Sequence, residues 1–156
     1  MRKENNMFKK MLVFMVGMAI VLSMVNVGVS ADTAAPMNPK VKEMIASARA
    51  AIKMVTPEVV KTAIDSKEKA IFLDVRDAGE FAAGHLPGSM NISRGTLEFN
   101  VFGKIPDQNV KIYVYCKTAA RSAMATKTLN DLGFKNAVLM DAPYENWVKA
   151  GYPVER

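Results

Sequence analysis

Short apolar runs that alternate with helical patterns constrain this chain more than any other feature of its sequence. Residues 71–75, 111–116 and 137–140 are near-continuous apolar runs of strand length, and residues 90–92 form a weaker one. A helical pattern that ends at Gly133 separates the second run from the third. Strand, helix and strand in this spacing predict right-handed crossovers and a parallel sheet covered on both faces. The predicted fold class is therefore α/β.

Two helices are expected before the first of these runs. Asn38 as N-cap and Pro39 at the first helical position announce a helix, and apolar residues then recur at positions 41, 44, 45, 48, 52 and 55. Such a stripe is typical of a helix that lies on the domain and covers its core. Thr56 and Pro57 begin a second helix by the same logic. Shorter helices are expected from Asp77 to Gly84, from Ser93 towards Phe99, and over residues 145–150.

The first 31 residues have the pattern of a secretory signal peptide. A basic region precedes an uncharged apolar run over residues 11–25, and Val29-Ser30-Ala31 gives the small-residue cleavage pattern. The basic region consists of Arg2, Lys3, Lys9 and Lys10. An uncleaved membrane anchor is the alternative, because about 18 apolar residues can span a bilayer.

This leader sets the expected organisation of the chain. A signal peptide over residues 1–31 is followed by a linker and N-terminal helix over 32–55 and by one domain over 56–156. A cleaved leader predicts a periplasmic or secreted protein without stable membrane association, whereas an uncleaved leader predicts a membrane-anchored one.

Composition excludes several classes of chemistry. One Cys and one His cannot form an intrachain disulfide or close a structural zinc site. We expect no metal and no other cofactor. The net charge of +6 falls to +3 without the leader, which carries four basic residues and Glu4. The remaining lysines are scattered among Asp and Glu, so nucleic-acid binding is not expected.

The lone cysteine ends the strongest of the expected strands. In a parallel sheet the ligand crevice lies beyond the carboxyl ends of the strands, and Cys116 is followed there by Lys117 and by a helix that begins near Arg121. The backbone N–H groups of such a turn, the helix N-terminus and the two cations favour a thiolate and an anionic ligand. The alternative is a Cys that packs as a small hydrophobe and an Arg121 that pairs with a surface carboxylate.

Three ordered motifs resemble the rhodanese (thiosulfate sulfurtransferase-like) family. They are LDVRDAGEFAAGHLPGSMNISRG from Leu73, CKTAARS from Cys116, and GFKNAVLM followed by WVKAGYPVE. The resemblance covers about residues 57–156 and implies a rhodanese-like fold, a five-stranded parallel sheet with helices on both faces, here preceded by the extra N-terminal helix. Four residues separate Cys116 from Arg121, as in the sulfurtransferases. The related dual-specificity phosphatases have five, so the loop length disfavours a phosphatase.

The resemblance implies sulfur transfer. The Cys116 thiolate would attack the outer sulfur of a donor such as thiosulfate, release sulfite and hold a persulfide, which a thiol or cyanide then accepts. The expected partners are a small anionic sulfur donor, a thiol acceptor and a redox partner for an exported thiol. Asp74, Arg76 and Glu80 match positions that support the sheet end and the active loop. The active loop itself comprises Lys117, Thr118, Ala119, Ala120, Arg121 and Ser122.

Three parts of the sequence depart from the family pattern. Gly is common at the position of Ala119, where a tight curl favours positive φ, and Ala119-Ala120 places two methyl groups in the loop. Ala142-Pro143 replaces a Gly-Gly pair, and Pro143 lacks an N–H. Lys117 keeps the charge of the Arg that is common there but lacks its planar fork. The alternative function is therefore a low-turnover or inactive module that binds sulfur or a partner.

Overall fold

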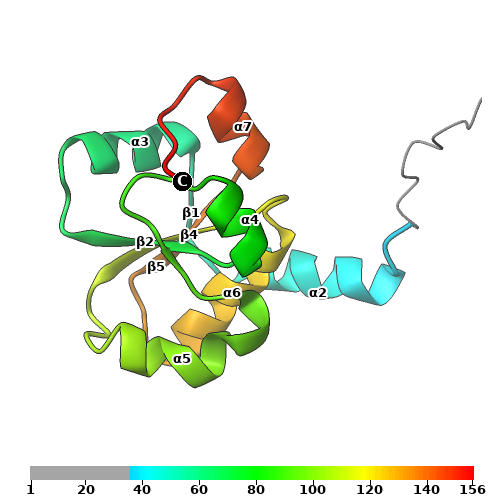
Figure 1. The fold of residues 1–156 in the computed structure, drawn as a ribbon. Helices are drawn as coiled ribbons and strands as arrows, with labels where there is room; N and C mark the ends of the chain where they lie inside the picture. Colours follow the sequence, from blue (N-terminus) through cyan, green and yellow to red (C-terminus); the bar gives the residue numbers. More distant parts are fainter. Residues whose placement is uncertain (1–35) are drawn as a thin grey trace, which may run out of the picture. The chain divides into compact units, whose positions relative to one another are not determined.

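A five-stranded parallel sheet forms the centre of the protein. The computed structural model describes residues 36–156 (Figure 1), and the expected signal peptide over residues 1–31 lies outside them. The strand order is β1-β5-β4-β2-β3. The strands are β1 (Met54–Val55), β2 (Ala70–Asp74), β3 (Met90–Asn91), β4 (Lys111–Tyr115) and β5 (Ala137–Met140). The predicted α/β class with a five-stranded parallel sheet is confirmed.

Helices cover both faces of the sheet (Figure 1). On one face lie α3 (Pro57–Asp65) and α7 (Tyr144–Lys149), and on the other lie α5 (Leu97–Lys104) and α6 (Ala120–Asp131). The remaining helical elements are α4 (Ala78–Ala83), which follows β2, and the 3-10 turn η1 (Arg94–Thr96), which precedes α5.

The central strand β4 contributes side chains to both hydrophobic cores. Ile112 and Val114 pack with α5 and α6, whereas Tyr113 and Tyr115 pack with α3 and α7. This alternation follows from the two-residue period of a strand. Burial on both faces explains why the strand is apolar after Lys111. Cys116 continues the alternation and packs in the core between the sheet, α5 and α6.

The N-terminal helix does not cover the core as its apolar stripe predicts. The helix α2 (Pro39–Ala50) begins where expected, and Asn38 Oδ1 accepts a hydrogen bond from Lys40 N at 2.9 Å. Only Ala48 of α2 is buried, whereas Val41 and Met44 are 37% and 60% exposed. The helix contacts α6 and extends away from the sheet (Figure 1). Within residues 36–156, none of the helices has the length and apolar character needed to cross a bilayer.

The helix α2 is also shorter than its apolar pattern indicates. The pattern continues to Ile52 and Val55, but α2 has ended by then and the chain enters β1, which pairs with β5. The strand β1, which completes the five-stranded sheet, therefore comes from the end of the segment 32–55, which was expected to be a linker and a helix. Arg49 donates two hydrogen bonds of 2.7 Å to the carboxylate of Asp141 just after β5, which ties the end of α2 to the same edge of the sheet.

Replacing Ala48 by Gln should loosen α2 without unfolding the domain. Ala48 is the buried residue of α2, so a polar side chain there disturbs its packing on the domain and leaves both cores of the sheet intact. We expect faster hydrogen exchange of the α2 amides and a thermal midpoint close to that of the wild type. Ala50→Gln, at an exposed position of the same helix, is the matched control. A large fall in the midpoint of Ala48→Gln alone would show instead that the domain needs α2 to fold.

Candidate active site

The single cysteine lies at the carboxyl end of β4, where the sheet predicts a ligand crevice. Cys116 is fully buried, and its Sγ accepts two hydrogen bonds from Ser122, from the backbone N at 3.3 Å and from Oγ at 3.2 Å. Hydrogen-bond donors that point at a sulfur hold it in place and would stabilise a negative charge that is transferred onto it. The first turn of α6 supplies both donors, so the strand and the helix together position the sulfur.

The loop between Cys116 and Ser122 contains backbone hydrogen-bond donors that have no acceptor in the described part of the protein. The backbone N–H groups of residues 117–121 donate no hydrogen bond to an acceptor within residues 36–156. The carbonyl groups of Cys116 and Lys117 are occupied, because both accept from the backbone N of Tyr144 at 3.2 Å. A turn whose carbonyls are held from outside and whose N–H groups have no protein acceptor is suited to an anion. Residues 116–121 are called the catalytic loop below, after the role that we propose for them.

Ala119 stores strain in the catalytic loop. It adopts the left-handed conformation, with φ +66° and ψ −4°, as the N-cap residue of α6. This conformation costs a residue other than Gly roughly 1 kcal/mol. Ala120 is the first residue of α6 and does not have a positive φ. Of the two alanines in the loop, Ala119 alone therefore carries the cost expected from the loss of Gly.

Carboxylates from α4 hold the side chain of Arg121. Its Nη1 and Nη2 donate to the two oxygens of Glu80 at 2.8 and 3.1 Å, and Nη1 also donates to Asp77 at 3.3 Å. Glu80 and Asp77 form the capping box of α4, so the ion pair joins the N-terminus of α4 to that of α6. The hydrogen bonds from Arg121 lower the pKa of Glu80, and the same hydrogen bonds raise the pKa of Arg121. Arg121 thus pairs with carboxylates, as the alternative interpretation of the sequence predicted.

Asp74 and Arg76 form a buried ion pair at the carboxyl end of β2. Arg76 Nε donates to both carboxylate oxygens at 3.0 and 2.9 Å, and Nη2 donates to Oδ2 at 2.6 Å. The guanidinium also donates to the carbonyl of Gly84 at 2.7 Å and lies 4.0 Å from the centroid of the Tyr144 ring. Burial opposes the charge, but the hydrogen bonds and the charge of Asp74 hold the pKa of Arg76 above its ordinary value.

The structure brings the expected residues to one end of the sheet through two networks. In the first network, Glu80 is connected to the catalytic loop through its ion pair with Arg121. In the second, the buried pair of Asp74 and Arg76 is connected to the loop through Tyr144. The ring of Tyr144 covers Arg76, and its backbone N–H donates to two carbonyls of the loop. Lys117 and Thr118 are exposed. Sequence reasoning missed Tyr144, although it directly follows the unusual Ala142-Pro143 pair. Within residues 36–156, no three His, Cys, Asp or Glu side chains group as metal ligands.

Comparisons with known proteins place the chain beside proteins named for sulfur transfer. The family model described as Rhodanese-like domain matches residues 56–150. The chain is 31% identical over 96 residues to "Putative sulfur carrier protein YrkF" of Bacillus subtilis, which covers 62% of this chain and 51% of that protein. It is 32% identical over 89 residues to thiosulfate sulfurtransferase GlpE of Pseudomonas putida, which covers 57% of this chain and 78% of GlpE. The chain thus spans about half the length of YrkF.

A solved structure gives the same result at the level of the fold. The polysulfide-sulfur transferase homodimer of Wolinella succinogenes has a TM-score of 0.65 and 30% sequence identity. The match covers 80% of this chain and 93% of that chain.

Glycine at position 119 should stabilise the protein, whereas glycine at position 120 should destabilise it. Ala119→Gly relieves left-handed strain worth roughly 1 kcal/mol, but Ala120→Gly only loosens the first turn of a helix, at a cost of up to about 1 kcal/mol. Urea unfolding of both variants beside the wild type measures the two changes in free energy. Changes of the same sign would mean that Ala119 is not strained.

The ion pair of Glu80 and Arg121 should make stability depend on pH in acid. The pKa of folded Glu80 lies below its ordinary value of 4.5. The contribution of the pair is therefore complete above the pKa of the unfolded chain and is lost as pH falls through the folded pKa. The difference in unfolding free energy between wild type and Glu80→Gln should be constant near neutral pH and should shrink below 4.5.

The difference should also be small and sensitive to salt, because the two side chains are 30% and 29% exposed. Glu145→Gln is the matched control, since this exposed carboxylate has no ion-pair partner within residues 36–156. A difference for Glu80→Gln that stays constant across the acid range would contradict the role given to the pair.

Proposed function

The chain belongs to the rhodanese-like domain family, and from that premise we propose that it transfers sulfane sulfur through a persulfide on Cys116. One observation carries the proposal, the setting of the sulfur at the end of β4. Ser122 donates two hydrogen bonds to Sγ, and the adjoining N–H groups of residues 117–121 have no protein acceptor. The relatives named thiosulfate sulfurtransferase and polysulfide-sulfur transferase support the same chemistry.

The first half-reaction loads the cysteine. The Cys116 thiolate attacks the outer sulfur of a donor such as thiosulfate, the S–S bond of the donor breaks, and sulfite leaves with the bonding electron pair. The product Cys116–S–S⁻ keeps its negative charge beside Ser122 Oγ and the N–H groups of the catalytic loop, which stabilise it. Lys117, exposed at the start of the loop, attracts the anionic donor.

The second half-reaction discharges the cysteine. The sulfur of an acceptor thiol attacks the outer sulfur of the persulfide, and the bond between that sulfur and Cys116 Sγ breaks. The acceptor leaves as a persulfide, and its proton passes to the released Cys116. In this step the released Cys116 sulfur takes the proton of the acceptor, and in the first half-reaction the Cys116 thiolate needs no separate general base. Neither half-reaction requires a cofactor.

A sulfur carrier with slow turnover is the second candidate function. Full burial of Cys116 limits the approach of an acceptor, and Arg121 is engaged by Glu80 and Asp77 instead of being left for the donor. The relative named as a sulfur carrier supports this candidate. Both candidates use the same persulfide and differ in how fast an acceptor removes its sulfur.

Intact mass after treatment with thiosulfate tests the proposed function. The wild type should gain one sulfur atom and release sulfite, and Cys116→Ser should gain none. Ser122→Ala keeps the nucleophile but removes one hydrogen bond to Sγ, so loading should slow by about tenfold. Loading that an acceptor thiol discharges supports the transferase, and loading that no acceptor discharges supports the carrier. Absence of a mass change with every sulfane donor would contradict both.

A further inference from the structure

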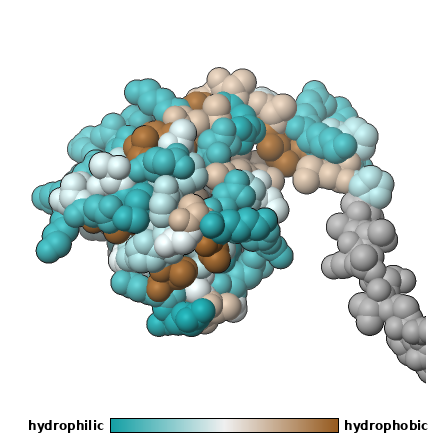
Figure 2. All heavy atoms as spheres, turned by 90° about the horizontal axis from the view of Figure 1, so that it is seen from above, coloured by the Kyte–Doolittle hydropathy of each residue, from teal (hydrophilic) through white to brown (hydrophobic). Residues whose placement is uncertain are grey.

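An open hollow lies between α2 and the catalytic loop, and the mechanism above does not use it. Its volume is about 370 Å³, and it is lined by Met37, by residues of α2 and by the loop residues Thr118, Ala119 and Ala120. Much of the lining is apolar, from Met37, Ile45 and Ala46 together with the two loop alanines. Figure 2 shows hydrophobic surface where α2 meets the rest of the domain, with hydrophilic residues around it. The helix α2 precedes residues 56–150, so this wall is an addition to the part that the family model matches.

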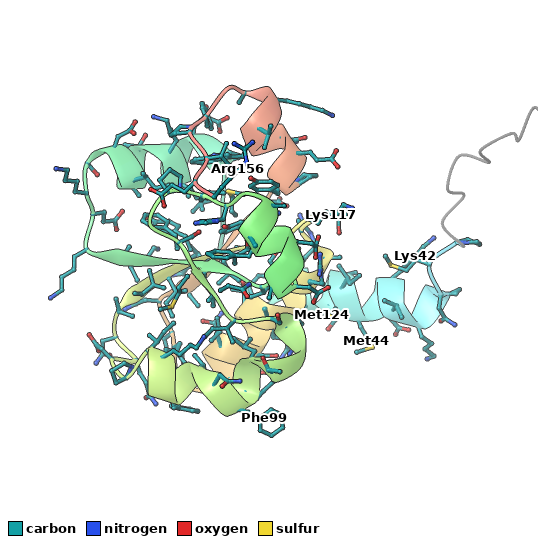
Figure 3. All side chains as sticks on the ribbon, in the orientation of Figure 1. Lys42, Met44, Phe99, Lys117, Met124 and Arg156 are labelled. Carbon is teal, nitrogen blue, oxygen red and sulfur yellow. The ribbon has the colours of Figure 1, made fainter. Side chains whose placement is uncertain are left out.

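One lysine of the lining, Lys42, has no carboxylate partner in the described part of the chain, and neither has Lys117, which directly precedes the lining residue Thr118. Lys42 lines the hollow from α2, and Lys117 begins the exposed part of the catalytic loop. Neither takes part in an ion pair within residues 36–156, whereas Arg49, on the same lining, is neutralised by Asp141. In the view of Figure 3, Lys42 and Lys117 lie above α2, and Met44 lies below it. Lys42 therefore adds a positive charge to the lining of the hollow.

The lining of the hollow fits an organic anion better than an inorganic one. Cyanide or sulfite has no apolar body to place on Met37, Ile45 and Ala46, whereas an organic thiol has one. Small-molecule sites commonly have volumes of about 300–1,000 Å³, mostly apolar linings and a few placed charges. The hollow meets these three conditions, and the loop that follows Cys116 forms one of its walls.

We propose that this hollow binds the sulfur acceptor, an organic thiol that carries a carboxylate. The carboxylate pairs with Lys42, the organic body rests on the apolar lining, and the thiol passes residues 118–120 to reach the persulfide. The balanced step is RSH plus Cys116–S–S⁻ to RSS⁻ plus Cys116–SH. This proposal rests on the sulfurtransferase function, and it makes Lys42 a residue that determines acceptor specificity.

The test compares two acceptors that share a body and differ in charge, glutathione and glutathione diethyl ester. In Lys42→Glu the ratio of kcat/KM for glutathione to kcat/KM for the ester should fall roughly fivefold, because an attraction becomes a repulsion in a solvent-exposed site. Lys40→Glu is the matched control, since Lys40 lies on the same helix outside the hollow. Equal falls in Lys40→Glu and Lys42→Glu would overturn the proposal, because they would show a general effect of net charge.

A binding measurement separates failure of this proposal from failure of the proposed function. S-methylglutathione cannot accept sulfur, so its binding does not depend on turnover. Titration should shift the NMR signals of the amides of Ile45, Ala46, Ala119 and Ala120, and Lys42→Glu should abolish the shifts. Shifts confined to other surfaces, or shifts unchanged in Lys42→Glu, would overturn the acceptor site. Loading of Cys116 by thiosulfate tests the transferase separately.

Discussion

The buried side chain of Arg76 determines how the end of the sheet is arranged. A guanidinium that is removed from water needs a carboxylate and further hydrogen-bond acceptors to replace the water. Asp74 supplies the counter-charge two residues earlier on the chain, Gly84 supplies a carbonyl after α4, and Tyr144 covers the cation from α7. Asn91 in β3 donates to the carbonyls of both members of the pair at 3.0 and 2.9 Å. Removing one partner of such a pair typically costs about 3–5 kcal/mol. The buried charge therefore links α4 and α7 to the end of β2, and Asn91 links β3 to the backbone of the same two residues.

This arrangement allows the catalytic loop to keep an unfavourable backbone. The loop is held on one side by Tyr144, which binds the carbonyls of Cys116 and Lys117, and on the other by Arg121 in its ion pair with Glu80. Strained residues persist where the surroundings determine their conformation more strongly than local preference does. Ala119 fits that description, because anchored segments on both sides leave its left-handed conformation as the connection between them.

The sequence predicts the core of this fold well because its central strands are buried on both faces and are therefore apolar over most of their length. Residues 71–75, 111–116 and 137–140 become β2, β4 and β5 with shifts of at most one residue at their ends. The strand β1 has two residues, too few to show a period, and it follows a helical stripe that conceals it. The stripe of α2 was interpreted wrongly as covering the core, since an apolar pattern does not reveal what lies opposite it.

The candidate site shows the same division between local and tertiary information. The place of Cys116 at the end of a strand follows from the order of elements, and the strain at Ala119 follows from the tight turn expected there. The pairing of Arg121 with Glu80 joins residues 41 positions apart and therefore cannot be predicted without the fold. The same holds for the contact of Tyr144 with the loop.

Among residues 36–156, both edge strands of the sheet, β1 and β3, contain two residues each. An added strand would find little open ladder there, so recognition of a protein partner falls to the helices and loops, and the sheet edges offer a poor template for aggregation.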